Sequence, residues 1–490
     1  MSRCRVIAAF AMVACVCPAA HGLEAFPGAE GFGAATVGGR GGQVIKVTNL
    51  NAAGPGSLQA ACSAAGPRTV VFEVSGVIRG DIYIQNPYIT LAGQTAPGAG
   101  ITIEGMLTCP GNGAGMGTHD IVVRHLRLRP RRRIGDTGDA VQMVGSGAHS
   151  IIIDHCSMSW AVDETIDLIH ARDVTVQWCT IEESDTEGHD QGRHNMGLLA
   201  AYDGTGNVSI HHNLWAHHGS RVPAVTPYEP DQPADFRNNV VYNVNTAFTP
   251  AGHGMYQESP INLVGNWYGR GPNNIGVGSD EAGMDYPLAP FAMETESGEI
   301  HIADNYIDDW GYVGDPRDWD WGQVPVWIPY NRKGVKLDAP ADVAAVTTQT
   351  ALEAYEAVLA EAGCWPRDRV TRWTVNDVRT RAGQWGRHGP LVPTDEWFLT
   401  GLTVGAAPLD TDDDGMPDDW ERAHGLDPND PADRNAIVPP GASPDDRHMG
   451  YTYVEFYLNE LADHLVPEPG TLALIAVGGL ALRRRHATRA

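Results

Sequence analysis

The chain has 490 residues, 42% of them hydrophobic and 19% charged, which excludes a largely disordered protein because such chains contain few hydrophobic residues. The formal net charge of −26 at pH 7 argues against a nucleic-acid partner, since phosphate binding needs a cationic face. The 57 glycines and 33 prolines are typical of a fold with many turns and short strands.

Residues 1–22 have the organisation of a secretory signal peptide. Arg3 and Arg5 precede an apolar run over residues 6–20, and Ala20-His21-Gly22 provides a small-residue cleavage site. The apolar run is shorter than the ~20 residues that a membrane-spanning helix needs. We therefore expect this segment to be removed and the rest of the chain to be exported, as a secreted or cell-surface protein.

Residues 23–345 read as an array of short strands separated by glycine-rich turns. Aliphatic and β-branched runs recur at residues 44–47, 69–74, 82–84, 89–91, 101–103, 121–123, 151–153, 174–176, 208–210, 240–241, 261–264 and 300–302. Strands this short, at fairly regular spacing, indicate a solenoid or a sandwich. The insertions at 184–196 and 267–297 would form outer loops, where solenoids usually carry their binding sites.

A repeated polar position distinguishes these two folds. Six of the runs lead into a triplet whose third residue is Cys156, Cys179, Asn213, Asn239, Asn266 or Asn305. In a parallel β-helix such residues stack about 4.8 Å apart, and asparagine tolerates a left-handed backbone and bonds its neighbour's amide. The sequence lacks the near-constant hairpin loops of a sandwich, so it predicts a parallel β-helix. The two cysteines would begin the ladder as stacked thiols, which we favour, or as a disulfide.

The pattern changes to helical after the strand array. Residues 348–360 have helical spacing, with Thr350 and Glu353 as a capping box and Gly363 as the stop. We expect residues 346–405 to form a short helical appendage on the side of the β-helix.

Residues 410–421 match the calcium loop of an EF-hand, D-x-D-x-D-G-x5-E, with Gly415 at the sharp turn. Its candidate metal ligands are Asp410, Asp412, Asp414 and Glu421. A helix over residues 451–464 would close this module, which occupies residues 406–465. We expect the module to bind Ca2+ in a structural role, stiffening the region before the C-terminal tail.

The tail, residues 466–490, contains Val466-Pro467-Glu468-Pro469, an apolar run at 470–482 and three arginines at 483–485. This order resembles the PEP-CTERM sorting signal of Gram-negative bacteria. The resemblance implies transient contact with the inner membrane through the tail, until a sorting protease removes it. A short C-terminal membrane anchor is the alternative, and both imply export.

Carboxylates from two neighbouring rungs provide a candidate active site. They are Asp136, Asp139, Asp163, Glu164 and Asp167. A converging set of carboxylate oxygens suits Ca2+, although solvated loop carboxylates have the same residue types. Arg221 follows a later strand and is either part of this site or a surface ion-pair partner. A zinc site among the histidines would need three or four converging ligands, so we favour stacking or substrate hydrogen bonding for them.

Several stretches together resemble the pectate lyases of polysaccharide lyase family 1, over about residues 26–379. They are EGFGAATVGGRGG, GPGSLQAAC, VVFEVSGVI, ITLAGQTAPGAGITIEG, GDAVQM, DHCSMSWAVDETIDL, VSIHHNLWAHHGSRVP and FRNNVVYNV. The resemblance implies an all-β fold, a right-handed parallel β-helix. It also implies calcium-dependent anti β-elimination on an acidic polysaccharide, α-1,4-polygalacturonate, and we expect a monomer.

The resemblance also implies roles for individual residues. Asp139, Asp163 and Asp167 match its calcium ligands and Arg221 its base, while Asp136 and Glu164 are added candidate ligands. His194 lies near the position of a substrate-binding lysine, and Arg131 and His217 are further candidate substrate contacts. Arg124, Arg127, Arg129 and Arg131–Arg133 would give the cleft a positive side. The alternatives are a non-catalytic, glycan-binding surface β-helix and a polygalacturonase-type hydrolase.

Overall fold

The computed structural model describes residues 22–109, 117–130, 138–228, 231–244, 249–250, 259–273, 291–292, 299–308, 311–313, 326–327, 335–387, 389–390, 392–443 and 446–466. The expected signal peptide and nearly all of the C-terminal tail lie outside these ranges, as do Arg131 and Asp136. Within the described part of the chain, none of the helices is both long and apolar enough to span a bilayer.

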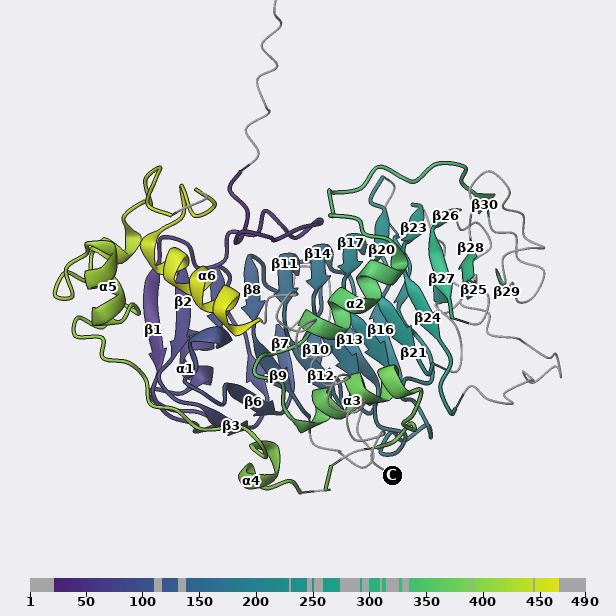
Figure 1. Ribbon diagram of the computed structural model, residues 1–490, viewed down its shortest axis with the longest axis horizontal. Coiled ribbons are helices and arrows are strands. Elements are labelled where there is room, and N and C mark those ends of the chain that lie inside the picture. Colours follow the sequence, from purple (N-terminus) through teal and green to yellow (C-terminus); the bar gives the residue numbers. More distant parts are fainter. Residues whose placement is uncertain are drawn as a thin grey trace, which may run out of the picture.

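Three long sheets run along the molecule, and the chain visits them in turn (Figure 1). The eleven-stranded first sheet contains β1 (Gln43–Val47), β2 (Arg68–Phe72), β5 (Ile89–Ala92), β8 (Ile121–Arg124), β11 (His149–Asp154), β14 (Arg172–Gln177), β17 (Gly206–His211), β20 (Ala234–Arg237), β23 (Ile261–Val264), β26 (Glu299–Ala303) and β30 (Val335–Lys336). The ten-stranded second sheet contains β3 (Gly76–Arg79), β6 (Ile101–Glu104), β9 (Leu126–Leu128), β12 (Ser157–Ser159), β15 (Thr180–Glu182), β18 (Leu214–Ala216), β21 (Val240–Tyr242), β24 (Trp267–Gly269), β27 (Asn305–Ile307) and β28 (Gly311–Val313).

The third sheet has seven shorter strands. They are β4 (Ile82–Tyr83), β7 (Leu107–Cys109), β10 (Val141–Met143), β13 (Glu164–Asp167), β16 (Met196–Ala200), β19 (Ala224–Val225) and β22 (Thr249–Pro250). A separate pair is formed by β25 (Phe291–Ala292) and β29 (Val326–Trp327).

The three sheets form a parallel β-helix, as the sequence predicted. Each strand pairs in parallel with its equivalent in the next rung; Ile151 of β11, for example, lies opposite Val174 of β14. Among the described strand pairs only β27 and β28 are antiparallel. The β-branched residues expected to point inward fill one continuous core, in which Ile151, Ile153, Val174 and Val176 are buried. The helix α1 (Leu58–Ser63) adds Leu58 and Cys62 to this core.

The predicted asparagine ladder is also confirmed. The Oδ1 atom of each asparagine accepts from the backbone N–H one rung earlier: Asn213 from Cys179 at 2.8 Å, Asn239 from Asn213 at 3.0 Å and Asn266 from Asn239 at 2.9 Å. At the start of the ladder, Cys156 N lies 3.4 Å from Cys179 Sγ and both thiols are free, so stacking, not a disulfide, is correct. The left-handed backbone falls on the residue before each ladder position, not on the asparagine itself.

A glycine-rich segment, residues 26–42, lies against the outer side of the first sheet. The backbone N–H of Gly33 donates to Thr175 Oγ1 at 2.8 Å, and that of Phe32 donates to Ser209 Oγ at 3.1 Å. A Cβ atom at Gly33 would come within 2.3 Å of the carbonyl oxygen of Ile151, so only glycine permits this approach. At the same end of the segment, Gly31 N–H donates to the carbonyl of Ala345 at 3.0 Å.

The predicted appendage covers the outer side of the second sheet with α2 (Ala351–Glu361) and α3 (Arg369–Thr380), followed by the short α4 (Asp395–Phe398) (Figure 1). The capping box of Thr350 and Glu353 is present at the start of α2, as predicted. Val358 of α2 and Val378 of α3 pack in one buried cluster with Tyr242 and Trp267 of the sheet. The appendage is therefore an integral cover of the β-helix.

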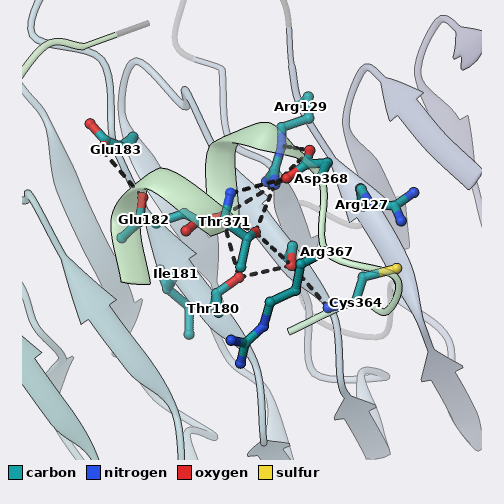
Figure 2. A network of polar contacts seen from close by, with 12 residues as sticks. Arg127, Arg129, Thr180, Ile181, Glu182, Glu183, Cys364, Arg367, Asp368 and Thr371 are labelled. Atoms are coloured by element: carbon teal, nitrogen blue, oxygen red, sulfur yellow. Dashed lines mark hydrogen bonds and ion pairs between the residues drawn. The ribbon is translucent and has the colours of Figure 1, made fainter. Parts of the chain in front are cut away.

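A buried polar network fixes α3 to the β-helix (Figure 2). Arg129, which follows β9, contacts Asp368 at 3.1 Å and Glu182 at 3.2 Å, and all three side chains are inaccessible to solvent or nearly so. Asp368 is also the N-cap of α3, where it accepts from the backbone N–H of Thr371 at 3.0 Å. The Thr371 hydroxyl donates to Glu182 at 2.6 Å.

The C-terminal module packs on the outer side of the first sheet near its N-terminal end (Figure 1). It contains α5 (Asp418–His424), the 3-10 helix η3 (Asp433–Asn435) and α6 (Tyr453–Leu465), the last close to the predicted 451–464. Val454 and Leu458 of α6 share a buried cluster with Val71 of β2 and Ala92 of β5. A second 3-10 helix, η1 (Gly93–Thr95), lies beneath α6.

Candidate active site

The register of the third sheet brings three predicted carboxylates together. Asp139 lies just before β10, and Glu164 and Asp167 begin and end β13. The two strands are neighbours, with Gln142 opposite Asp167. One carboxylate oxygen from each of Asp139, Glu164 and Asp167 lies within 4.8 Å of the others, and all three residues are buried. We call these three residues the carboxylate cluster.

Asp163 precedes β13 and faces two histidines from the connection before β16. Its Oδ1 atom lies 3.4 Å from His194 Nε2, and its Oδ2 atom lies 3.6 Å from His189 Nε2. The two imidazole rings stack with their centroids 4.1 Å apart. The insertion at residues 184–196, expected to be an outer loop beside the site, therefore brings His194 next to a candidate metal ligand.

Arg221 lies shortly before β19, a strand further along the same sheet, and it too faces the carboxylate cluster. Ser220 bridges to Met196, which lies opposite Glu164 in the sheet. The carbonyl of Arg221 accepts from Leu198 N–H at 2.7 Å, and its φ of 54° is left-handed. This backbone directs the guanidinium to Glu164, where Nη1 contacts Oε1. The Arg221 side chain is 12% exposed, so the ion pair is largely shielded from water.

Burial and mutual repulsion perturb the titration of the carboxylate cluster. Burial, together with the charge of Asp163, raises the pKa of Asp139 to about 7. Burial, Asp139 and Asp163 raise the pKa of Asp167 well above its usual range. The Oδ1 atoms of Asp139 and Asp167 are buried and have no hydrogen-bond partner. An all-oxygen set with such orphaned acceptors fits Ca2+, which takes oxygen ligands and would offset the repulsion.

Gln142 is a residue of this site that the sequence reasoning missed. Its side-chain amide donates to Asp139 Oδ2 and so orients that carboxylate. Gln142 belongs to the same GDAVQM stretch as Asp139, three residues later. Its closeness to Asp139 in the sequence was the only signal that could have identified Gln142, because glutamine side chains on strands have many structural roles.

His217, expected to contact substrate, does not reach the carboxylate cluster. Its ring is fully buried, 3.6 Å from Asp377 of α3 and 3.8 Å from Glu183, and Asn243 Nδ2 lies 2.8 Å from its Nδ1 atom. This burial is incompatible with substrate contact, so the expectation is corrected. His217 instead joins the β-helix to the helical appendage.

The expected positive side of the cleft is also corrected. Arg124 is paired with Asp154 at 2.8 Å, and its guanidinium lies over the ring of Phe26. Arg127 is buried and donates to the carbonyls of Ala99 and Pro366. Arg129 belongs to the network of Figure 2. All three guanidinium groups therefore serve the packing of the fold, and Arg131 lies outside the described residues.

The four acidic residues predicted in the EF-hand-like loop lie in the C-terminal module, in an arrangement separate from the carboxylate cluster. Oxygens of Asp410, Asp412 and Asp414 lie within 4.8 Å of one another. Glu421, on α5, is fully buried, and its charge interacts with those of the other three.

Curated relatives match nearly the whole chain. Probable pectate lyase C from Aspergillus terreus is 34% identical over 465 residues, covering 93% of this chain and 98% of that relative. The protein of the same name from Aspergillus flavus is 34% identical and covers 90% of this chain and 94% of the relative. Among solved structures, pectate lyase Bsp165PelA from Bacillus sp. N165 in complex with trigalacturonate covers 68% of this chain and 98% of its own, at 16% identity and a TM-score of 0.44.

A second match concerns the tail. The PEP-CTERM protein-sorting motif matches residues 465–485, which confirms the resemblance seen in the sequence. Residues 23–345 account for only about two thirds of the chain, so the match to the Aspergillus terreus relative extends past the β-helix. With a relative 34% identical over 93% of its length, the chain belongs to the pectate lyase family of polysaccharide lyases.

Proposed function

We propose that this protein is a calcium-dependent pectate lyase that cleaves α-1,4-polygalacturonate by anti β-elimination, with Arg221 as the base. The observation that carries the proposal is the convergence of Arg221 with the carboxylate cluster, which the third sheet assembles from separate rungs. The names of the curated relatives support the same substrate class.

The residues Asp139, Asp163, Glu164 and Asp167 are the proposed calcium ligands, with Gln142 holding Asp139 in place. When bound there, Ca2+ supplies the positive charge that holds the uronate carboxylate against an acidic enzyme and favours loss of the neighbouring C5 proton. His194, beside Asp163, is placed to contact the substrate carboxylate.

Arg221 takes the C5 proton of the uronate in this mechanism. The electron pair of the broken C–H bond forms the C4–C5 double bond, and the bond from C4 to the glycosidic oxygen breaks. That oxygen leaves with a proton from solvent, which gives a 4,5-unsaturated chain end.

The ordinary pKa of arginine exceeds ~12, so the neutral form of Arg221 must be favoured by its surroundings. The ion pair with Glu164 favours the charged form. Catalysis therefore requires that Glu164 be engaged by another cation, which the neighbouring ligand positions allow.

Ultraviolet absorbance of the unsaturated product on polygalacturonate tests the proposal. We expect Arg221→Ala to lower kcat by roughly 10²–10⁴-fold, the range for a lost general base, and a chelator to abolish the signal. Arg422→Ala, at an exposed arginine of α5, is the matched control. His194→Ala should raise KM more than it lowers kcat.

Other outcomes would decide against the proposal. Full activity in Arg221→Ala would remove it as the base. New reducing ends without ultraviolet absorbance would identify a hydrolase, and glycan binding without turnover would identify a non-catalytic surface protein.

We also propose that the protein is exported and acts as a monomer, with its tail in transient contact with the membrane before removal. The matched sorting motif at residues 465–485 supports the export route. Intact mass measurement of the protein recovered outside the cells tests it, because the proposal expects a chain that lacks the tail.

A further inference from the structure

We propose that Asp410, Asp412, Asp414, Glu421 and Asp433 form a second calcium site, and that the ion bound there fastens the C-terminal module to the first rungs of the β-helix. This site lies in the C-terminal module and is independent of the proposed lyase chemistry.

The loop is already folded around a central point. Asp410 accepts from the backbone N–H groups of Asp414 at 3.3 Å and Gly415 at 2.9 Å, and Asp414 Oδ1 accepts from Met416 N–H at 2.9 Å. Gly415 has a φ of 94°, the left-handed turn that position 6 of a calcium loop requires. These local hydrogen bonds fix the conformation of the loop. The carboxylate oxygens that take no part in them are available to bind a ligand.

Glu421 is the observation that points to a ligand. It is 0% exposed, and both of its carboxylate oxygens are buried with no hydrogen-bond partner. The two oxygens of Asp412 and the Oδ2 atom of Asp414 are in the same condition. A buried carboxylate without a donor or a cation is costly. Glu421 holds position 12 of the loop, which in EF-hands binds calcium through both oxygens.

Asp433 of η3 completes the set, although it lies outside the twelve-residue motif. Its Oδ1 atom is buried without a partner, while Oδ2 accepts from Asp427 N–H at 3.2 Å. The ninth loop position, Asp418, is not free to serve, because it accepts from Thr411 N–H at 2.8 Å and from the Thr411 hydroxyl at 2.9 Å. Asp433 therefore supplies the oxygen that Asp418 does not.

The crowding of these carboxylates explains the need for a cation. Burial, followed by the charges of Asp414 and Asp412, raises the pKa of Glu421 to about 8. Burial and the neighbouring Asp412 and Asp410 raise the pKa of Asp414 to about 7. The side-chain cations seen against the loop lie at its edge, where Lys46 pairs with Asp410 and Arg422 pairs with Asp418.

The loop contacts the β-helix through Met416 and through the ion pairs of Asp410 and Asp413 with Lys46. Met416, at position 7, is fully buried in the cluster that contains Val71 of β2 and Ala92 of β5. Asp410, at position 1, pairs at 3.0 Å with Lys46 of β1, which also pairs with Glu73 at 2.9 Å. An ion that fixes the shape of the loop thereby fixes both contacts, so calcium binding and docking of the module are coupled.

Titration calorimetry and thermal unfolding of the full-length secreted chain test the proposal, with Ca2+ as the ligand. We expect the variant Asp412→Asn/Glu421→Gln to bind one calcium ion fewer than the wild type and to lose part of the calcium-induced rise in Tm. Its module should also be cut by a protease at calcium levels that protect the wild type. Asp419→Asn, at a fully exposed loop position, removes the same kind of charge and should match the wild type.

Two further variants test the role of Asp433 and separate failure of this site from failure of the proposed lyase site. Asp433→Asn leaves the twelve-residue loop intact and should weaken calcium binding at this site about tenfold, which is equivalent to ~1.4 kcal/mol. Asp139→Asn/Glu164→Gln removes carboxylates of the proposed lyase site and should retain protection of the module, so failure of that site does not mimic failure of this one. Unchanged stoichiometry and protection in Asp412→Asn/Glu421→Gln would overturn the proposal.

Discussion

At the turn between the first and second sheets, two adjacent residues have different roles. One adopts a left-handed backbone, and the next occupies the ladder position. His125, His155, Trp178 and His212 adopt the left-handed conformation, with φ between 47° and 55°. Their rings stack from rung to rung, with centroids 5.1, 6.0 and 4.4 Å apart. The next residue in each later rung belongs to the asparagine ladder. The sequence predicted the ladder from its spacing, but it could not assign the left-handed position, because asparagine tolerates that backbone better than histidine or tryptophan.

The ladder makes a prediction for Asn239, whose side chain is fully buried. Asn239→Ala would leave Asn213 N–H without its acceptor and the carbonyl of Ile210 without its donor. Each unsatisfied buried group costs about 1–3 kcal/mol, so we expect unfolding free energy to fall by roughly 2–5 kcal/mol. Urea denaturation measures it. Asn376→Ala, at an exposed position of α3, should stay within about 0.5 kcal/mol of the wild type.

Asp154 gives a prediction about acid stability. Burial alone would raise its pKa, but His155 and Arg124, at 2.9 and 2.8 Å, hold the pKa of the carboxyl below its ordinary value. A pKa lowered by folding adds stability above the unfolded value of about 3.9, and this contribution is lost as the pH falls below it.

Asp154→Asn should therefore flatten the fall in Tm between about pH 5 and pH 2, although its Tm at neutral pH will be lower. Scanning calorimetry across that range checks this. Asp419→Asn, fully exposed, should keep the wild-type pH dependence. A parallel fall in Tm for Asp154→Asn and the wild type would show that the carboxyl is not the source of the acid sensitivity.

At the scale of elements, the strands of the third sheet were the least predictable part of the fold. The runs of the first sheet carry several alternating β-branched residues, and the sequence predicted nine of its strands. Strands such as Val141–Met143 and Ala224–Val225 contain only two or three residues, too few to show a period. The structure nevertheless brings Asp139, Glu164 and Asp167 together, because residues at equivalent rung positions meet whatever the strand length, while Asp136 lies outside the described residues.

Asp368 has two roles, because it caps the N-terminus of α3 and also pairs with buried Arg129. The effect of losing both roles can be measured. Asp368→Ala would remove both the cap and one of the two carboxylates paired with buried Arg129, and breaking a buried ion pair costs about 3–5 kcal/mol. Thr350→Ala removes the exposed cap of α2 and should cost only about 1 kcal/mol. Chemical denaturation of the two variants compares them. Equal losses would mean that Arg129 does not depend on Asp368.

At the scale of the whole molecule, some features could be predicted from the sequence and others could not. The fold class, the appendage and the calcium-loop motif each depend on local patterns, and all three are visible in the sequence. The burial of Arg124, Arg127 and Arg129 depends on partners as far away as Asn459, 335 residues along the chain. A run of arginines is therefore indistinguishable from a surface patch until the helices that cover it are placed.

The free thiols make a prediction for the intact protein. All five cysteines in the described residues are free and buried. A reducing agent should therefore leave Tm unchanged, and a thiol reagent should react only after denaturant is added. A lower Tm under reducing conditions would contradict the assignment of Cys156 and Cys179 as stacked thiols.

The glycine-rich segment along the first sheet, residues 26–42, affects how the newly synthesised chain folds. Gly33 needs Thr175, 142 residues later, and Glu30 bonds Thr347, 317 residues later. The segment therefore cannot dock fully until the rungs that contain Thr175 and Ser209 have been made, long after its own synthesis. Nascent chains that stop short of Thr175 lack the acceptors of both Gly33 and Phe32, which leaves this part of the segment accessible to quality-control proteases.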